Sequence, residues 1–280
     1  MLETRRPGTK SMPKTLASAA DRHDLYQRSV QTPDRDIRWI CNAYGKLAGR
    51  DLRTFREDFC GTTALSCAFV KRHPDNTAIG VDLDGPTLDW GTRHNLARLK
   101  PETRERVRLI QADVRDVVRP KVELLAAANF SWFIFHERAA LGAYFKNCLK
   151  SLVEGGWLFL DLWGGSEAHA CHSETRRLKG FTYTWDQEKF DPIGGKTLAH
   201  IHFGFRDGSK LERAFTYDWR LWSLPETQDL LREVGFEDVH VYWEGAHAES
   251  GKGTGIFRRR TEGTPDLSYV AYVMARRPAR

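Results

Sequence analysis

The sequence predicts an α/β protein with a mostly parallel central sheet, and three observations support this fold class. The stretch 52–84 has the pattern of a strand, a small-residue turn at 60–63, a helix and a second strand, which together form a βαβ unit. Apolar runs of strand length then alternate with helical patterns up to about residue 163. The strands expected at 77–84 and 107–114 each carry an acidic residue near the carboxyl end. Such strand ends meet at one edge of a parallel sheet.

The first half of the chain divides into three expected segments. Residues 1–20 are polar, contain two prolines, and are expected to form a disordered basic tail. Residues 21–50 show helical patterns in two pieces that split near Pro33. Residues 51–165 hold the βαβ unit and the core of the sheet. Its three further strands are expected at 107–114, 124–133 and 157–163.

Residues 166–222 follow a different pattern and are expected to form an antiparallel β insert. Alternating polar and apolar residues run over 181–190, 197–206 and 210–221, with turn residues between them. An α/β sheet does not need such an aromatic-rich insert for stability, whereas a substrate pocket needs a variable apolar wall. The insert is therefore expected to be a substrate cap or a homodimer contact.

Residues 223–280 are expected to complete the core sheet. A helix begins at residue 224, and a strand is expected at 239–243. The polar, glycine-rich residues 245–266 predict a loop, and 269–275 predict the final strand.

The turn and the neighbouring strand ends predict a nucleoside site. The helix after the turn directs unpaired N–H groups and the positive end of its dipole at the turn, where Gly61 permits close approach. Asp82 can accept two hydrogen bonds from a ribose diol. Asp113 can accept one from an adenine amino group, with Asp116 as the alternative if the loop turns differently. The backbone N–H of Val114 can donate to a ring nitrogen.

The same turn resembles motif I of the class I S-adenosylmethionine (SAM) dependent methyltransferases, small-molecule type. That motif is usually an acid followed by G-x-G-x-G, and the segment Glu-Asp-Phe-Cys-Gly-Thr at 57–62 is similar to a variant of it. Alignment on Cys60-Gly61-Thr62 puts Glu57 at the acid, Phe59 at the first glycine and Thr63 at the third. The resemblance extends over roughly residues 50–277.

This resemblance implies a Rossmann-like, seven-stranded, mostly parallel sheet whose last strand is antiparallel. It also implies SAM as cofactor, S-adenosylhomocysteine (SAH) as product, a lid formed by residues 21–50 and a SAM-binding core at 51–165. Leu83 would lie against adenine, and Asn129, at the motif IV position, would lie near the methyl group. The full cofactor-binding set is Glu57, Phe59, Cys60, Gly61, Thr62, Asp82, Leu83, Asp113, Val114 and Asn129.

The leading functional hypothesis is methyl transfer to a small-molecule acceptor by in-line displacement. Because the cofactor carries the chemical drive, the protein mainly positions and desolvates the reactants. A general base is needed if the nucleophile arrives protonated, and the candidates are His136, Asp161 and Tyr26. Two alternatives remain: an RNA or other nucleic-acid methyltransferase, and a SAM-binding module without catalysis. An NAD-dependent oxidoreductase is disfavoured because the turn has one glycine where its fingerprint needs three.

Composition narrows the compartment and the partners. The chain is 41% hydrophobic and 29% charged, and no apolar run is long enough to span a membrane, so we expect a cytoplasmic protein. Five cysteines without a C-x-x-C pair favour reduced thiols over disulfides or a zinc site, and no metal is expected. The net charge of +6 is concentrated in residues 1–14 and 258–280, so nucleic-acid binding is not expected.

Overall fold

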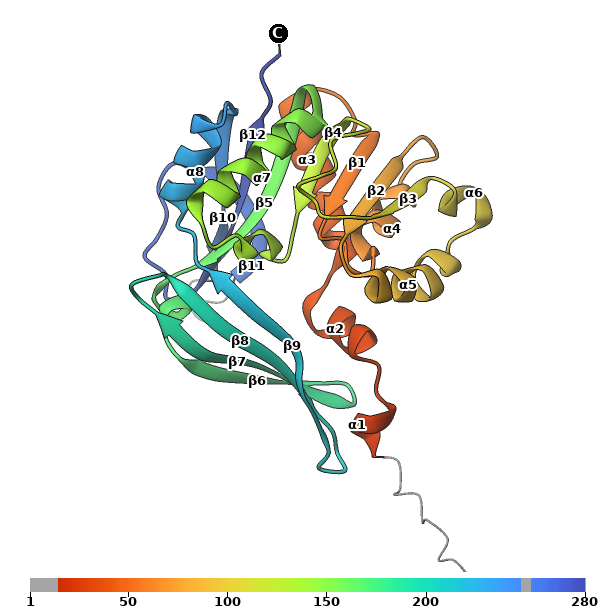
Figure 1. Cartoon of the computed structure of the whole chain (residues 1–280), viewed down its shortest axis with the longest axis vertical. Coiled ribbons are helices and arrows are strands. Elements are labelled where there is room, and N and C mark those ends of the chain that lie inside the picture. Colours follow the sequence, from red (N-terminus) through yellow and green to blue (C-terminus); the bar gives the residue numbers. More distant parts are fainter. Residues whose placement is uncertain (1–14, 248–252, 280) are drawn as a thin grey trace, which may run out of the picture.

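The computed structural model describes residues 15–247 and 253–279 and contains one main sheet with a separate smaller sheet (Figure 1). The main sheet has eight strands in the order β11 (Gly253–Arg260), β10 (Glu237–Ala246), β12 (Tyr269–Arg276), β5 (Leu152–Gly164), β4 (Val122–Ala127), β1 (Thr54–Asp58), β2 (Thr77–Asp82) and β3 (Val107–Gln111). The five strands β1 to β5 pair in parallel. β12 is antiparallel to both β5 and β10, and β11 is antiparallel to β10. The predicted mostly parallel sheet with an antiparallel last strand is confirmed.

The strand count differs from the prediction, because the sheet has eight strands and not seven. The additional strand is β11, which lies inside the stretch 245–266 that the sequence predicts as a loop. Its residues include two glycines and three consecutive arginines, which show no strand alternation. An edge strand pairs on one side only, so it forms here without that pattern. Residues 248–252 of the predicted loop lie outside the described residues.

Helices cover both faces of the main sheet (Figure 1). α3 (Pro33–Ala48) and α4 (Ala64–Val70) pack on one face, and α7 (Arg138–Ser151) and α8 (Leu224–Glu233) pack on the other. Leu124 and Leu125 are neighbours in β4, yet each is fully buried in a different one of these two cores. The continuously apolar sequence of β4 is therefore explained by burial on both faces. The remaining core helices are α5 (Gly85–His94), α6 (Pro101–Arg104) and short 3-10 turns at Leu96–Arg98, Ser131–Ile134 and Ser166–His169.

The predicted insert is an antiparallel sheet that follows β5. It contains β6 (His172–Leu178), β7 (Phe181–Asp191), β8 (Lys196–Gly204) and β9 (Lys210–Arg220), paired in that order. Three of these strands match the predicted ranges. β6 was not predicted because its sequence, HSETRRL, is polar almost throughout and mostly exposed. Figure 1 shows this sheet beneath the strand ends of the core, on the side where the N-terminal helices lie.

The N-terminal segment forms helices that contact both sheets. α1 (Leu16–Ala19) lies inside the range 1–20 predicted as a disordered tail, and residues 1–14 lie outside the described residues. The backbone N–H of Leu16 donates to Asp207 Oδ2 at 2.8 Å, which fixes α1 to the turn before β9. α2 (Arg22–Val30) and α3 are the two predicted helical pieces, and they separate just before Pro33. Pro33 occupies the first turn of α3, where its missing N–H has no consequence.

Candidate functional site

The motif I loop, residues 59–63, joins β1 to α4. Three of its residues have a left-handed backbone conformation of the kind that glycine adopts most easily. The φ angle is +56° at Phe59, +49° at Gly61 and +62° at Thr63. These are the three positions aligned with the motif I glycines. A non-glycine residue in this left-handed region costs about 1–2 kcal/mol, so packing must hold Phe59 and Thr63 there. Phe59 contacts Tyr144 with ring centroids 5.7 Å apart, and Thr63 is fully buried.

Asp82, at the end of β2, holds the motif I loop through its carboxylate. Its Oδ2 accepts the backbone N–H of Gly61 at 2.7 Å, and its Oδ1 accepts that of Asp84 at 2.9 Å. The structure therefore brings Gly61 and Asp82 together, as the adjacent ends of β1 and β2 require. Each carboxylate oxygen keeps a further lone pair that can accept a hydroxyl. Leu83, the next residue, is 67% exposed and leaves an apolar surface beside this carboxylate.

Asp113 follows β3 at the same edge of the sheet. The backbone N–H of Ala112 donates to the carbonyl of Asp82 at 3.0 Å, which places the two strand ends side by side. The Asp113 carboxylate is engaged by the guanidinium of Arg115, with the shortest contact 2.6 Å, and this pairing lowers the pKa of Asp113. Val114 is buried, and its carbonyl accepts from Arg56 at 3.2 Å. No sequence pattern predicted that the guanidinium of Arg115 would pair with the Asp113 carboxylate.

Glu57 and Cys60 are buried side chains that stabilise the motif I loop region: Glu57 caps α4, and Cys60 packs against β2. Glu57 Oε2 accepts both the backbone N–H (2.9 Å) and the hydroxyl (2.6 Å) of Ser66, so it caps the start of α4. Burial raises the pKa of Glu57 to about 8. Burial also raises the pKa of the Cys60 thiol well above its ordinary value, so Cys60 is a neutral, packed side chain. A Cβ at Gly80 would lie 2.8 Å from its sulfur, which shows how closely β2 approaches the loop.

α2 is connected to the motif I loop, to α5 and to the insert. Gln27 Nε2 donates to Thr62 Oγ1 at 2.8 Å. The indole N–H of Trp90, on α5, donates to Asp21 at 2.6 Å, and Asp21 is also the N-cap of α2. Arg28 donates to the carbonyl of Lys179 in the β6–β7 turn at 2.8 Å. This helix lies within residues 21–50, and the lid expected there stays a prediction.

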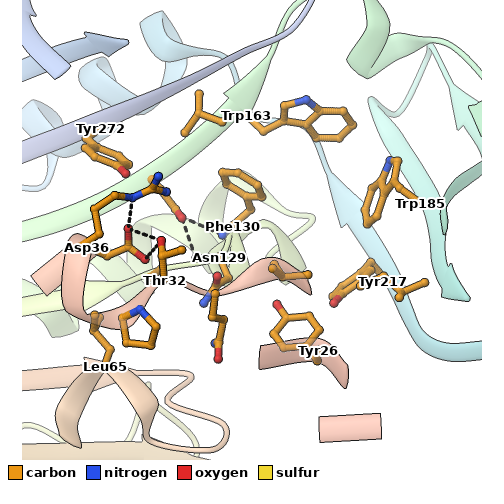
Figure 2. A pocket seen from close by; sticks show the side chains of 18 of the residues that line it. Tyr26, Thr32, Asp36, Leu65, Asn129, Phe130, Trp163, Trp185, Tyr217 and Tyr272 are labelled. Atoms are coloured by element: carbon orange, nitrogen blue, oxygen red, sulfur yellow. Dashed lines mark hydrogen bonds and ion pairs between the residues drawn. The ribbon is translucent and has the colours of Figure 1, made fainter. Parts of the chain in front are cut away.

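A cavity of about 480 Å³ lies between the core, the N-terminal helices and the inner face of the insert (Figure 2). Among the sequence-predicted site residues, Tyr26, Glu57, Asn129 and Asp161 line it. The other predicted site residues lie outside the lining: His136, Phe59, Cys60, Gly61, Thr62, Asp82, Leu83, Asp113 and Val114. His136 Nε2 instead lies 2.9 Å from the carbonyl of Asp218. The lining residues are Tyr26, Val30, Gln31, Thr32, Pro33, Arg35, Asp36, Ile40, Glu57, Leu65, Ala128, Asn129, Phe130, Phe159, Asp161, Trp163, Glu167, His172, Glu174, Arg176, Tyr183, Trp185, Ile201, Tyr217, Trp219, Ser268, Val270 and Tyr272.

Asp161 holds the turn that ends β4. Its two carboxylate oxygens accept the backbone N–H groups of Asn129 and Phe130 at 2.7 and 2.8 Å. Both of those residues have positive φ, 58° and 56°, so the strand predicted at 124–133 ends at Ala127. Burial raises the pKa of Asp161 to about 7, although the two backbone N–H groups oppose this rise. Asp161, the acidic residue within the otherwise apolar β5, thus holds the turn after β4 in place. It also provides a carboxyl group at the cavity wall.

Aromatic side chains of the insert form the opposite wall (Figure 2). The ring centroids of Tyr217 and Trp219 are 4.4 Å apart, and those of Trp185 and Tyr217 are 5.6 Å apart. Tyr26 on α2 lies beside Tyr217, and burial raises the pKa of Tyr26 to about 12. A phenol with that pKa stays protonated at neutral pH and can donate or accept a hydrogen bond, and the predicted role of Tyr26 as a general base stays a prediction.

Sequence comparison and structural comparison give different results. No protein-family model matches the sequence, and no curated protein matches it either. Solved structures do match in fold. A SAM-dependent methyltransferase from Clostridium acetobutylicum has 16% identity and a TM-score of 0.67, over 92% of this chain and 98% of its own. The chain has the fold of the SAM-dependent methyltransferases.

Two further neighbours with this methyltransferase fold have described substrates. SAM-bound CalS10, an amino pentose methyltransferase from Micromonospora echinaspora, has 16% identity and a TM-score of 0.64, over 96% of this chain and all of its own. KedS8, a sugar N-methyltransferase from Streptoalloteichus, has 16% identity and a TM-score of 0.61, over 99% of each chain. The predicted fold resemblance is confirmed along nearly the whole chain.

Two kinds of feature do not occur among the described residues. In residues 15–247 and 253–279, no helix is both long and apolar enough to cross a membrane. Within the same residues, no group of three or more His, Cys, Asp or Glu side chains is arranged to hold a metal ion.

Gly91 provides a test of how tightly the methyltransferase fold packs α5 against the motif I loop. A Cβ at Gly91 would lie 2.6 Å from the backbone oxygen of Thr62, which also accepts the amide of Asn95. We expect Gly91→Ala to lower the free energy of unfolding by about 1–3 kcal/mol despite the higher helix propensity of alanine. Urea denaturation measures this. Gly142→Ala, also in a helix but 3.4 Å from a flexible leucine, should be neutral or stabilising, and equal effects would contradict the inferred packing.

The raised pKa of Glu57 predicts a pH dependence of stability. Because the folded-state pKa of about 8 exceeds the ordinary 4.5, the folded protein binds this proton more tightly than the unfolded chain does. The resulting stabilisation is complete below about pH 4 and is lost as the pH rises toward 8. Between pH 5 and pH 8 we expect the free energy of unfolding to fall by roughly 3–4 kcal/mol less in Glu57→Gln than in the wild type. Urea denaturation at both pH values checks this, and Glu105→Gln, at an exposed position, should behave as the wild type.

Proposed function

We propose that the protein is a SAM-dependent methyltransferase that acts on a small molecule. The observation that carries this proposal is the motif I loop, with its three left-handed residues and its Asp82-bound Gly61. Glu57 and Leu65, on either side of this loop in the sequence, line an aromatic cavity. The cofactor, when bound, would supply a methyl group activated by a sulfonium sulfur. The protein would supply orientation and a partly dry site.

The residues at the strand ends fit the adenosine part of SAM. Asp82 keeps free lone pairs for a ribose diol, and the exposed face of Leu83 suits an adenine ring. Glu57 and Leu65 line the cavity from the motif I side. The methionine part would therefore pass over the loop toward Asn129. Asp113 would meet the adenine amino group only by sharing its carboxylate with Arg115.

The cavity is the proposed acceptor site. Its volume of about 480 Å³ lies in the range for small-molecule pockets, and the inner face of the insert supplies its aromatic wall. We therefore assign the insert to substrate recognition. The sugar acceptors of CalS10 and KedS8 support an acceptor of similar size. We retain Asp161 and Tyr26 as residues that contact the acceptor, and not His136, which lies outside the lining.

Label transfer from methyl-labelled SAM separates the two enzyme hypotheses. The protein is incubated with a small-metabolite extract and, separately, with total RNA. We expect label in the small-molecule fraction, accompanied by SAH, and none above background in RNA. Label in RNA alone would refute the small-molecule assignment, and SAH formation in neither mixture despite SAM binding would favour a non-catalytic module.

A further inference from the structure

The cavity is acidic, and this property is independent of the motif I loop. Five carboxylates line it, whereas only two guanidinium groups and one histidine do. The carboxylates are Asp36, Glu57, Asp161, Glu167 and Glu174, and the basic groups are Arg35, Arg176 and His172. Glu57, with its pKa raised to about 8, is mostly protonated at neutral pH, but the other four carboxylates still outnumber the two guanidinium groups. A cavity with this balance attracts cations and repels phosphate or carboxylate ligands.

Two of these carboxylates, Asp36 and Asp161, are weakly paired with cations. In residues 15–247 and 253–279, the exposed guanidinium of Arg35 is the one cationic group that pairs with either of them. Among the described residues, the donors to the Asp161 carboxylate are the backbone N–H groups of Asn129 and Phe130. Asp36 accepts the Thr32 hydroxyl at 3.1 Å, and its distance to the exposed guanidinium of Arg35 is 3.6 Å (Figure 2). Burial raises the pKa of both carboxyl groups, and a bound cation would offset that burial cost.

Gln31 adds an acceptor to the same wall. Within the described parts of the chain, its Oε1 is buried and has no hydrogen-bond partner. A buried acceptor in that state costs about 1–3 kcal/mol, which a donor on a ligand would recover. The Gln31 oxygen and the ionised carboxylates of Asp36 and Asp161 are all acceptors, so each of them can bind an N–H or O–H group of the ligand.

The opposite wall is suited to a cation as well. Tyr217 and Trp219 lie 4.4 Å apart by ring centroid, and Trp163 stands perpendicular to Trp185 with centroids 5.9 Å apart. The faces of tyrosine and tryptophan rings attract ammonium groups, by about 0.5–2 kcal/mol. Stacked aromatic side chains also provide an apolar surface for a ring-sized molecule.

Resting on the methyltransferase function proposed above, we propose that the acceptor is an amine. It enters the cavity as a cation, between the acceptors Gln31, Asp36 and Asp161 and the aromatic wall of the insert. Before its nitrogen can act as a nucleophile, the ammonium must release one proton, and the nearest carboxylate can receive it and pass it to solvent. The methylated nitrogen is again a cation and stays compatible with the same walls.

Three six-membered-ring probes that differ in charge test this proposal by binding, without need for turnover. Cyclohexylamine, cyclohexanol and cyclohexanecarboxylate are titrated at pH 7.5 into protein saturated with SAH, with tryptophan fluorescence as readout, since Trp163, Trp185 and Trp219 line the cavity. We expect cyclohexylamine to bind at least ten times more tightly than either other probe. Equal binding, tighter binding of the carboxylate, or no measurable binding of any probe would overturn the proposal.

Two matched variants test whether the preference for the amine probe depends on a carboxylate of the cavity wall. Asp36→Asn removes one charge from the cavity wall, and Asp186→Asn removes one from a side chain outside the lining with nearly the same exposure, 36% against 35%. We expect Asp36→Asn to reduce the amine preference at least threefold and Asp186→Asn to leave it unchanged. Equal effects would overturn the assignment. Asp161 is not the test position because it also anchors the turn at Asn129.

The same titration separates this inference from the proposed function. If the carboxylates served only the ammonium group of the cofactor, the amine preference would disappear when SAH is present, which would overturn the proposal. If SAH did not bind but cyclohexylamine kept its preference, the methyltransferase function would fail and the amine site would stand.

Discussion

Replacing Arg56 with alanine should lower the free energy of unfolding by about 3–5 kcal/mol, the largest stability effect that we expect in this protein. Arg56 lies in the middle of β1 and is fully buried. Its Nε donates to Asp58 Oδ1 at 2.6 Å, and its terminal nitrogens donate to the carbonyls of Val117 and Val114. Without the guanidinium, the one polar partner left to the buried Asp58 carboxylate in the described part of the chain would be the Tyr144 hydroxyl, 3.0 Å away.

Urea denaturation of Arg56→Ala and of Arg53→Ala measures this effect. Arg53 precedes the same strand but is one-third exposed; it pairs with Asp51 at the surface and donates to Asn76 Oδ1 at 3.1 Å. Its loss should therefore cost about 1–2 kcal/mol, less than the loss of Arg56. Removing both partners, as in Arg56→Met with Asp58→Leu, should cost less than Arg56→Ala alone because no buried charge is left unpaired. A wild-type midpoint for Arg56→Ala would show that the buried pair is not formed.

Replacing Asp82 with alanine should weaken SAH binding at least a hundredfold, or about 2.7 kcal/mol. The substitution removes both acceptors for the ribose diol and releases the N–H groups of Gly61 and Asp84. Calorimetric titration with SAH measures the loss. Asp84→Ala is the matched control, since Asp84 bonds only the Thr87 hydroxyl at the surface, and its affinity should stay within about threefold of wild type. Unchanged affinity in a folded Asp82→Ala protein would refute the assigned role.

The parts of the fold that the sequence predicted are those in which local pattern and burial agree. β4 is apolar because both of its faces are buried, and α4 begins at Ala64 directly after the predicted turn. β6 and β11 were not predicted because these edge strands are polar or arginine-rich and lack the alternation of apolar and polar residues. The early end of β4 also escaped prediction, because Asn129 adopts a left-handed conformation that only the distant Asp161 stabilises.

Some residues of the candidate site were also predictable from the sequence, and others were not. Asp82 and Gly61 were predicted from strand order alone, because adjacent parallel strands must bring their ends together. Asp36 was not singled out, although it lines the cavity, because an acid in the first turn of a helix is ordinarily a surface residue. The position of His136 was not predictable either, because it depends on a contact with Asp218, which is far away in the sequence. His136 therefore lies outside the cavity lining.

Calorimetric titration of the wild-type protein with SAH, and separately with NAD, tests the central claim most directly. The loop geometry and Asp82 predict binding of about one SAH per chain with a dissociation constant in the micromolar range or tighter, and no heat of binding for NAD. A folded protein that does not bind SAH, or that binds NAD equally well, would contradict the assignment of this crevice to SAM.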